Sequence, residues 1–211
     1  MKEEELYELI NKLNQKVGAT NSNDSISWHA HRTVEKMSDD SLYPILIKIV
    51  GDNRQAKNKA IRRAAYYIIG TMLRNVFNKE VCWFFIQQLG AENDKYILSD
   101  ILECLSKFSI PQEFDISLII EHSKSDKWLI RHSAINALGS SASQKSRQAL
   151  LYYLNQDDED KFKYEIIYSN CSLGKIGTEA DIPFLQKHIN SRKSDIRISA
   201  KIAIETISQR S

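Results

Sequence analysis

Apolar residues recur along this chain at a spacing that belongs to one side of an α-helix. In the stretch SDIRISAKIAIETI, Ser194 to Ile207, apolar or small residues stand at i, i+4, i+7, i+8 and i+11, counted from Ile196. An α-helix has about 3.6 residues per turn, so these positions share one face. The spacing therefore predicts an amphipathic helix that begins near Ser194.

The same spacing occurs six times in the chain. The copies start near residues 26, 61, 97, 130, 162 and 196, so the successive steps are 35, 36, 33, 32 and 34 residues. The fifth copy is degraded, because Ser169 and Asn170 stand where the other copies place apolar residues. A buried amide needs a partner, so we expect either a local hydrogen bond for Asn170 or a shifted helix register.

A second set of apolar helical segments alternates with these six helices. These segments are LYELINKL, SLYPILIKIV, KEVCWFFIQQL, FDISLIIEHS, SRQALLYYL and DIPFLQKHI. Short turns rich in Gly, Asn, Ser and Asp separate them from the six copies, with Asp24, Asp126 and Ser194 as expected N-caps. No helix pair could bury its apolar faces alone, whereas stacked pairs form one continuous core. The pattern thus predicts an all-α fold of about twelve helices without a sheet, a right-handed α-solenoid (α-α superhelix) of about six pairs in a single domain over residues 1–211.

Three stretches carry a more specific resemblance. SLGKIGTEADIPFLQKHI followed by SDIRISAKIAI resembles the short HEAT repeat of the phycobilisome-lyase type, and DKWLIRHSAINALG and NKAIRRAAYYIIG show the same pattern. The resemblance extends from about residue 38 to the end, while residues 1–37 match by spacing alone. It implies a binding scaffold whose second helices line a concave face. It also implies that the basic residue after each first apolar position bridges turn acids and carbonyls within its own repeat; these residues are Arg62, Arg131, Lys163 and Arg197.

Composition narrows the partners and the compartment. The chain has 29 basic and 27 acidic residues and a net charge of +2, which argues against a dedicated nucleic-acid binder. Cys82, Cys104 and Cys171 are far apart and form no C-x-x-C pair, which favours unpaired thiols in a reducing compartment. The N-terminus is acidic and helical, and no apolar run approaches the roughly 18 residues that a membrane span needs. We therefore expect a cytoplasmic protein that does not act at a membrane.

The polar side of the six helices indicates a binding surface. Positions i+2, i+6 and i+9 lie opposite the apolar face and are rich in aromatic and basic residues, the types that dominate binding hot spots. The competing interpretation is an ordinary solvated surface, on which such residues are also common. The candidate partner-binding residues on the expected concave face are Trp28, Arg32, Arg63, Tyr67, Arg74, His132, Asn136, Tyr164, Tyr168 and Lys175.

The common catalytic and metal-binding motifs are absent from the sequence. There is no H-E-x-x-H, no His-Glu dipeptide, no Walker loop and no G-x-S-x-G elbow. His29 and His31 are two residues apart and therefore point to different sides of a helix. We therefore predict no catalytic residue, no metal and no cofactor.

Two functions from different classes remain at this stage. The first is a non-enzymatic scaffold or inhibitor that holds a protein in its groove, of which a toxin-neutralising immunity protein is one version. The second is a nucleic-acid-binding or DNA-glycosylase-like HEAT solenoid. The alkylpurine glycosylases use a groove aspartate, whereas the expected groove here offers only Glu35, Glu103 and Glu205.

Overall fold

The computed structural model describes residues 1–15 and 24–210, and within them it contains twelve α-helices and no strand. The expected helix count and all-α class are therefore confirmed for this part of the chain. Contacts divide the chain into two compact units, Met1–Cys82 and Trp83–Ser211. The expectation of one repeat domain over residues 1–211 stays a prediction.

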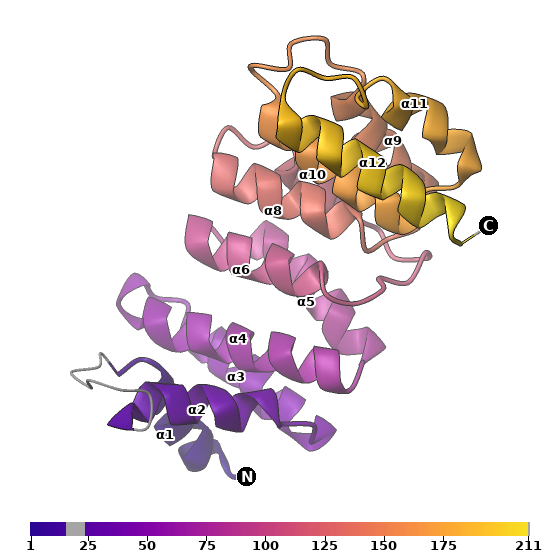
Figure 1. The fold of residues 1–211 in the computed structure, drawn as a ribbon. Helices are drawn as coiled ribbons and strands as arrows, with labels where there is room; N and C mark the ends of the chain where they lie inside the picture. Colours follow the sequence, from indigo (N-terminus) through magenta and orange to yellow (C-terminus); the bar gives the residue numbers. More distant parts are fainter. Residues whose placement is uncertain (16–23, 211) are drawn as a thin grey trace. The chain divides into compact units, whose positions relative to one another are not determined.

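The first unit contains two helix pairs. They are α1 (Glu3–Leu13) with α2 (Ile26–Glu35), and α3 (Tyr43–Asp52) with α4 (Lys59–Asn75). Helix α4 packs against α1, α2 and α3, and Figure 1 shows α2 and α4 side by side in front of α1 and α3. The core between these layers includes Leu6, Ile10, Leu46 and Ile69, which are fully buried. Helix α5 (Lys79–Ala91) crosses the boundary between the units.

The second unit continues the alternation. Its helices are α6 (Lys95–Leu105), α7 (Ser117–His122), α8 (Trp128–Leu138), α9 (Gln144–Leu154), α10 (Lys163–Ile176), α11 (Ile182–Gln186) and α12 (Ser194–Ser208). Helix α10 packs against α8, α9 and α12, and α6 packs against α8. In Figure 1, α8, α10 and α12 run side by side as one layer of this unit. The second helices of the predicted pairs thus form one layer, and the first helices form the other.

The six predicted apolar registers are mostly buried. In the fourth copy, from Ile130 to Ser141, every predicted core position is buried. Ile61 is only half-buried, and Ile26 is 48% exposed, so the expectation of a buried first position is wrong for the first copy. Helix α2 packs mainly against α1 and α4, and these contacts leave Ile26 in its first turn exposed.

Three of the four basic residues of the repeat motif bind a turn of their own repeat, as expected. Each of these arginines donates a hydrogen bond of 2.6 Å from its Nη1 atom to a backbone carbonyl in the preceding turn. The pairs are Arg62 with Asn53, Arg131 with Ser125, and Arg197 with Ser191. Lys163 differs from the expectation, because it forms an ion pair of 2.8 Å with Asp195 on helix α12 of the next repeat. All four side chains therefore make structural contacts within the chain.

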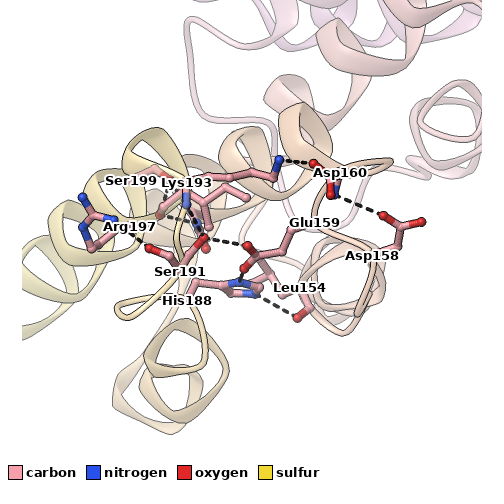
Figure 2. A network of polar contacts seen from close by, with 11 residues as sticks. Leu154, Asp158, Glu159, Asp160, His188, Ser191, Lys193, Arg197 and Ser199 are labelled. Carbon is pink, nitrogen blue, oxygen red and sulfur yellow. Dashed lines mark hydrogen bonds and ion pairs between the residues drawn. The ribbon is translucent and has the colours of Figure 1, made fainter.

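Polar contacts also join the turns of successive repeats, as Figure 2 shows for the last two. Glu159 accepts a hydrogen bond of 2.7 Å from the Ser191 hydroxyl. His188 is buried, and its Nε2 lies 3.0 Å from the carbonyl oxygen of Leu154, which can only accept. Lys193 pairs with Asp160. The interface between these repeats is therefore set by polar groups as well as by the apolar core.

The predicted helix N-caps are displaced by one residue. The N-cap positions of α2, α8 and α12 are Ser25, Lys127 and Lys193, rather than Asp24, Asp126 and Ser194. Ser25 accepts a hydrogen bond from the backbone N–H of Trp28, as an N-cap serine should. At α8 and α12, the Ser125 and Ser191 hydroxyls instead accept from the N–H of the N-cap lysine.

Asn170 has a local hydrogen-bond partner, as predicted from the sequence. It is fully buried, and its Nδ2 donates to the Ser199 hydroxyl at 3.0 Å and to the Ile196 carbonyl at 3.4 Å. Its Oδ1 has no hydrogen-bond partner among the described residues. Ser199 also donates to Ile196, so its own hydroxyl would stay satisfied without the amide. The cost at this position therefore lies in the unpaired carbonyl oxygen.

Replacing Asn170 with leucine should consequently raise the free energy of unfolding by about 1 kcal/mol, because it removes a buried unpaired acceptor and adds apolar contact. Urea denaturation followed by circular dichroism measures this change. Asn170→Asp is the matched control and should destabilise, since it buries an unpaired charge. A loss of stability in Asn170→Leu would show that the two bonds to α12 outweigh the unpaired oxygen.

Candidate functional site

In the first unit, the predicted residues form two small clusters. The Arg32 guanidinium lies 5.2 Å from the centre of the Trp28 ring and also pairs with Glu35 at 2.7 Å. The Tyr67 ring meets His31 edge to face at 4.9 Å. Arg63 and Arg74 are exposed on α4. The second-helix side of this unit is therefore aromatic and basic.

In the second unit, His132 is the centre of an aromatic cluster. Its ring centre lies 5.1 Å from that of Tyr168 and 5.8 Å from those of Tyr164 and Trp128. One turn along α8, Asn136 donates to the Ser106 hydroxyl at 3.3 Å and accepts from Lys175 at 3.3 Å. The structure thus brings together five of the predicted residues, His132, Asn136, Tyr164, Tyr168 and Lys175.

A buried carboxylate, that of Glu165, contacts His132 at the centre of this cluster. Glu165 is 4% exposed, and its Oε1 accepts from Arg131 Nε at 2.6 Å and lies 3.1 Å from His132 Nε2. Burial is the largest influence on the pKa of Glu165 and would raise it. The hydrogen bonds from Arg131, the backbone and His132 together outweigh burial, so this pKa lies below its ordinary value. Glu165 is therefore ionised at neutral pH and fixes the orientation of His132.

Exposure separates the predicted residues into two groups. Trp28, Arg32, Arg63, Arg74, Tyr164, Tyr168 and Lys175 are exposed. Tyr67, His132 and Asn136 are only partly exposed. The reason is that neighbouring helices contact them; His132, for example, lies against α10. These three side chains support the surface more than they display it.

Five of the exposed large apolar side chains of the second unit lie on the helices α8, α10 and α12. We name the surface formed by Trp128, Tyr164, Tyr168, Ile198 and Ile202 the α8–α10–α12 face. Trp128, the most exposed of them at 64%, was not among the predicted binding residues. It lies one turn before His132 on the same stripe, at i−2. Extending the i+2 and i+6 stripe back by one helical turn would have found it.

Among the residues that the structure describes, no cluster of His, Cys, Asp or Glu could hold a metal ion, and no helix is long and apolar enough to cross a membrane. Cys82, Cys104 and Cys171 form no disulfide. Burial raises the pKa of Cys82 to about 12 and also raises the pKa of Cys171. Both side chains are therefore protonated thiols at neutral pH and poor nucleophiles.

Comparison with known proteins identifies the repeats. Residues 116–205 match the family model for HEAT repeats, which confirms the resemblance for this segment. A search of curated proteins finds no match.

Three solved structures resemble the chain along its length. An engineered protein shares 16% identity at a TM-score of 0.50, with 99% of this chain and 98% of that chain covered. The designed armadillo repeat protein YIII(Dq)4CqI shares 13% identity at a TM-score of 0.51, with 96% and 99% covered. A related designed armadillo protein, solved in complex with the peptide (KR)4, shares 13% identity at 0.53, with the same coverage. At these identities the likeness concerns the fold alone, and it confirms the α-solenoid class.

Proposed function

Because residues 116–205 are HEAT repeats, we propose that the protein is a non-enzymatic scaffold or inhibitor that binds another protein through its second helices. The observation that supports this proposal is the α8–α10–α12 face. Soluble proteins rarely expose a contiguous group of large apolar side chains unless that surface meets a partner. The proposed place of action is the cytoplasm, which suits three cysteines that form no disulfide.

Physical features of this face suit a protein ligand. Tyr and Trp offer large contact areas at a small cost in side-chain entropy, and they are enriched in binding hot spots. Tyr164 and Tyr168 lie against the ring of His132, which Glu165 holds in turn, so both tyrosines are oriented before a partner arrives. Preorganised side chains lose less freedom on binding. One of the similar solved structures, a designed armadillo repeat protein, is in complex with the peptide (KR)4, so a fold of this class can bind a peptide.

A toxin-neutralising immunity protein is one form of this function, because a preorganised helical face can cover an active site. A scaffold and an inhibitor use the same contacts, so the identity of the partner distinguishes them. A photo-reactive amino acid placed at Tyr168 should cross-link the partner in a native extract, whereas one placed at Tyr152 on α9 should not. Mass spectrometry then identifies the captured protein, which is produced in pure form for affinity measurements.

Truncating Tyr164 to alanine should weaken binding of that partner by about thirtyfold, or roughly 2 kcal/mol, if it is an anchor. The matched control is Tyr152→Ala. The two tyrosines are similarly exposed, 57% for Tyr164 and 53% for Tyr152, but they lie on different helix layers. Isothermal titration calorimetry measures affinity, and the melting temperature of both variants should stay near that of the parent. Equal affinities for Tyr164→Ala and the parent, with a loss in Tyr152→Ala, would move the binding surface to the first helices.

The second candidate function, nucleic-acid binding, is favoured by one observation. The second-helix side of the first unit carries Arg32, Arg63 and Arg74 together with Trp28 and Tyr67. The bases of single-stranded nucleic acids stack on aromatic side chains of this kind, and nearby arginines contact the strand. Nuclease treatment of the extract before cross-linking distinguishes the two functions. Capture that survives nuclease supports a protein partner, and capture that is lost supports the alternative.

A further inference from the structure

A cleft of about 750 Å³ lies at the C-terminal ends of α6, α8, α10 and α12, within the second unit. Three cationic residues line it: Lys107 after α6, Lys175 near the end of α10, and Arg210 after α12. The described residues that line it include no Asp or Glu. This is a local basic site on a chain whose overall net charge is only +2.

Among the residues that the structure describes, the contacts of Lys175 and Arg210 are to neutral oxygen atoms. Lys175 donates to the amide oxygen of Asn136 at 3.3 Å, and Arg210 donates to the carbonyl oxygens of Lys175 and Gly177. All of these acceptors are neutral. Cations are favourable at helix C-termini, which explains why they gather there, but helix ends carry only partial charges. A cleft with three full positive charges therefore attracts an anionic group.

The rest of the lining determines what kind of anion fits. Phe108, Ile110, Pro111 and Ile176 supply apolar contact, and Ser109 and Ser140 add hydroxyl groups. A small inorganic anion would leave the apolar part unused, and a nucleic-acid strand would need a longer basic track than three cations. An acidic peptide, with carboxylates on an apolar and amide-bearing chain, matches both parts of the lining.

The cleft is continuous with the proposed binding surface. On α10, Tyr164, Tyr168, Cys171 and Lys175 stand at i, i+4, i+7 and i+11, so they share one side of the helix. The stripe on α8 likewise continues from His132 and Asn136 to Gly139, which lines the cleft. A chain that crosses the aromatic face in this direction therefore reaches the cations.

We propose that this cleft binds an acidic segment of the protein partner, one or more Asp or Glu side chains or a terminal carboxylate, next to the residues that contact the α8–α10–α12 face. This inference rests on the proposed function and adds the chemistry of the partner to it. The aromatic face supplies contact area, and the cleft selects a partner by charge and sets the direction in which it lies.

The direct test uses fluorescein-labelled probes and the full chain. The acidic peptide (Glu-Asp)4 should bind the parent protein at low salt, and binding should weaken at high salt. The double variant Lys107→Glu/Lys175→Glu should weaken it by about tenfold or more, because it reverses two of three charges. Lys107→Glu alone should show part of this loss, and it keeps the hydrogen bond from the Lys107 backbone N–H to the Cys104 carbonyl. The matched control is Lys124→Glu/Lys161→Glu, two exposed lysines of the same unit outside the cleft, which should change affinity by no more than about twofold.

Each outcome supports or overturns the inference. Absence of (Glu-Asp)4 binding, or an equal loss in the cleft and control variants, would overturn it. Tighter binding of (Lys-Arg)4 would overturn it by showing the opposite charge preference. Binding of a single-stranded DNA octamer with the same variant dependence and higher affinity would assign the cleft to nucleic acid. If (Glu-Asp)4 does not bind, but Tyr164→Ala still weakens binding of the captured partner, then the inference of an acidic ligand is wrong and the proposed function is supported.

Discussion

Replacing Glu165 with alanine should lower the free energy of unfolding by about 3 kcal/mol, the lower end of what removal of one member of a buried ion pair costs. The side chain of Glu165 is 5% exposed, and that of His132 is 12% exposed. Without the carboxylate, Arg131 Nε and His132 lose their common acceptor in a site that water reaches poorly. Arg131 keeps its bond to the Ser125 carbonyl and is 25% exposed, which holds the cost to this lower value.

Two variants define the origin of that cost. Glu165→Gln keeps the shape and one acceptor for Arg131, so it should destabilise less than Glu165→Ala. Glu205→Ala removes an exposed glutamate from the neighbouring helix α12 and should change stability by no more than about 0.5 kcal/mol. Urea denaturation of the three variants measures the effects. A change in Glu165→Ala as small as that in Glu205→Ala would show that the buried contacts contribute little.

The pH dependence follows from the lowered pKa of Glu165. The folded state binds this proton more weakly than the unfolded state does, so the carboxylate contributes stability at pH values above the unfolded pKa. That contribution is lost as the pH falls below about 4.3, the ordinary value for glutamate, and through the lower folded pKa. The stability difference between the parent and Glu165→Gln should therefore be constant near neutral pH and shrink in acid. A difference that grows in acid would contradict the assigned ion pair.

The sequence predicts the repeat architecture well because one spacing carries the signal. The i+4 position is buried in all six copies, and Ala137 and Ala203 at i+7 are also buried as expected, whereas Thr33 at i+7 of the first copy is exposed. The exposed position Ile26 differs because burial there depends on a neighbouring repeat, and spacing within one helix does not report the neighbour. Periodicity therefore predicts which side of a helix is apolar, and the position in the stack determines whether that side is covered.

The candidate site is less predictable, because its residues differ in their cross-helix partners. His132 and Tyr164 share the same i+2 offset, yet Glu165 and two tyrosines enclose His132 while Tyr164 stays exposed. The cationic cleft is harder still to foresee. Lys107, Lys175 and Arg210 come from three separate helix ends, and only the packing of those helices brings them together. A pattern of offsets along one helix contains no information about such a juxtaposition.

Gly139 is a further position whose contacts with a neighbouring helix cannot be predicted from offsets along its own helix. The sequence places it at i+9 on the outward stripe of α8, yet it is buried against α10. A Cβ atom built on Gly139 would lie 2.8 Å from Ser172 Cβ and 2.9 Å from Ser172 Cα. Its φ of −68° is open to any residue, so space rather than backbone conformation requires glycine here. Helices α8 and α10 can approach this closely only because no side chain stands between them.

Gly139→Ala should therefore destabilise the protein by about 2–3 kcal/mol, since the backbone of Ser172 cannot rotate away and the two helices must separate. Gly51→Ala is the matched control of opposite sign. Gly51 is exposed in α3, and a Cβ there would have no neighbour within 4 Å, so alanine should stabilise by about 0.5–1 kcal/mol through a stiffer unfolded chain and better helix propensity. Urea denaturation followed by circular dichroism compares the two variants, each acting in its own compact unit. If both substitutions stabilised the protein, α8 and α10 could move apart at no cost in free energy. That result would contradict the close packing that places His132 against Tyr164 and Tyr168.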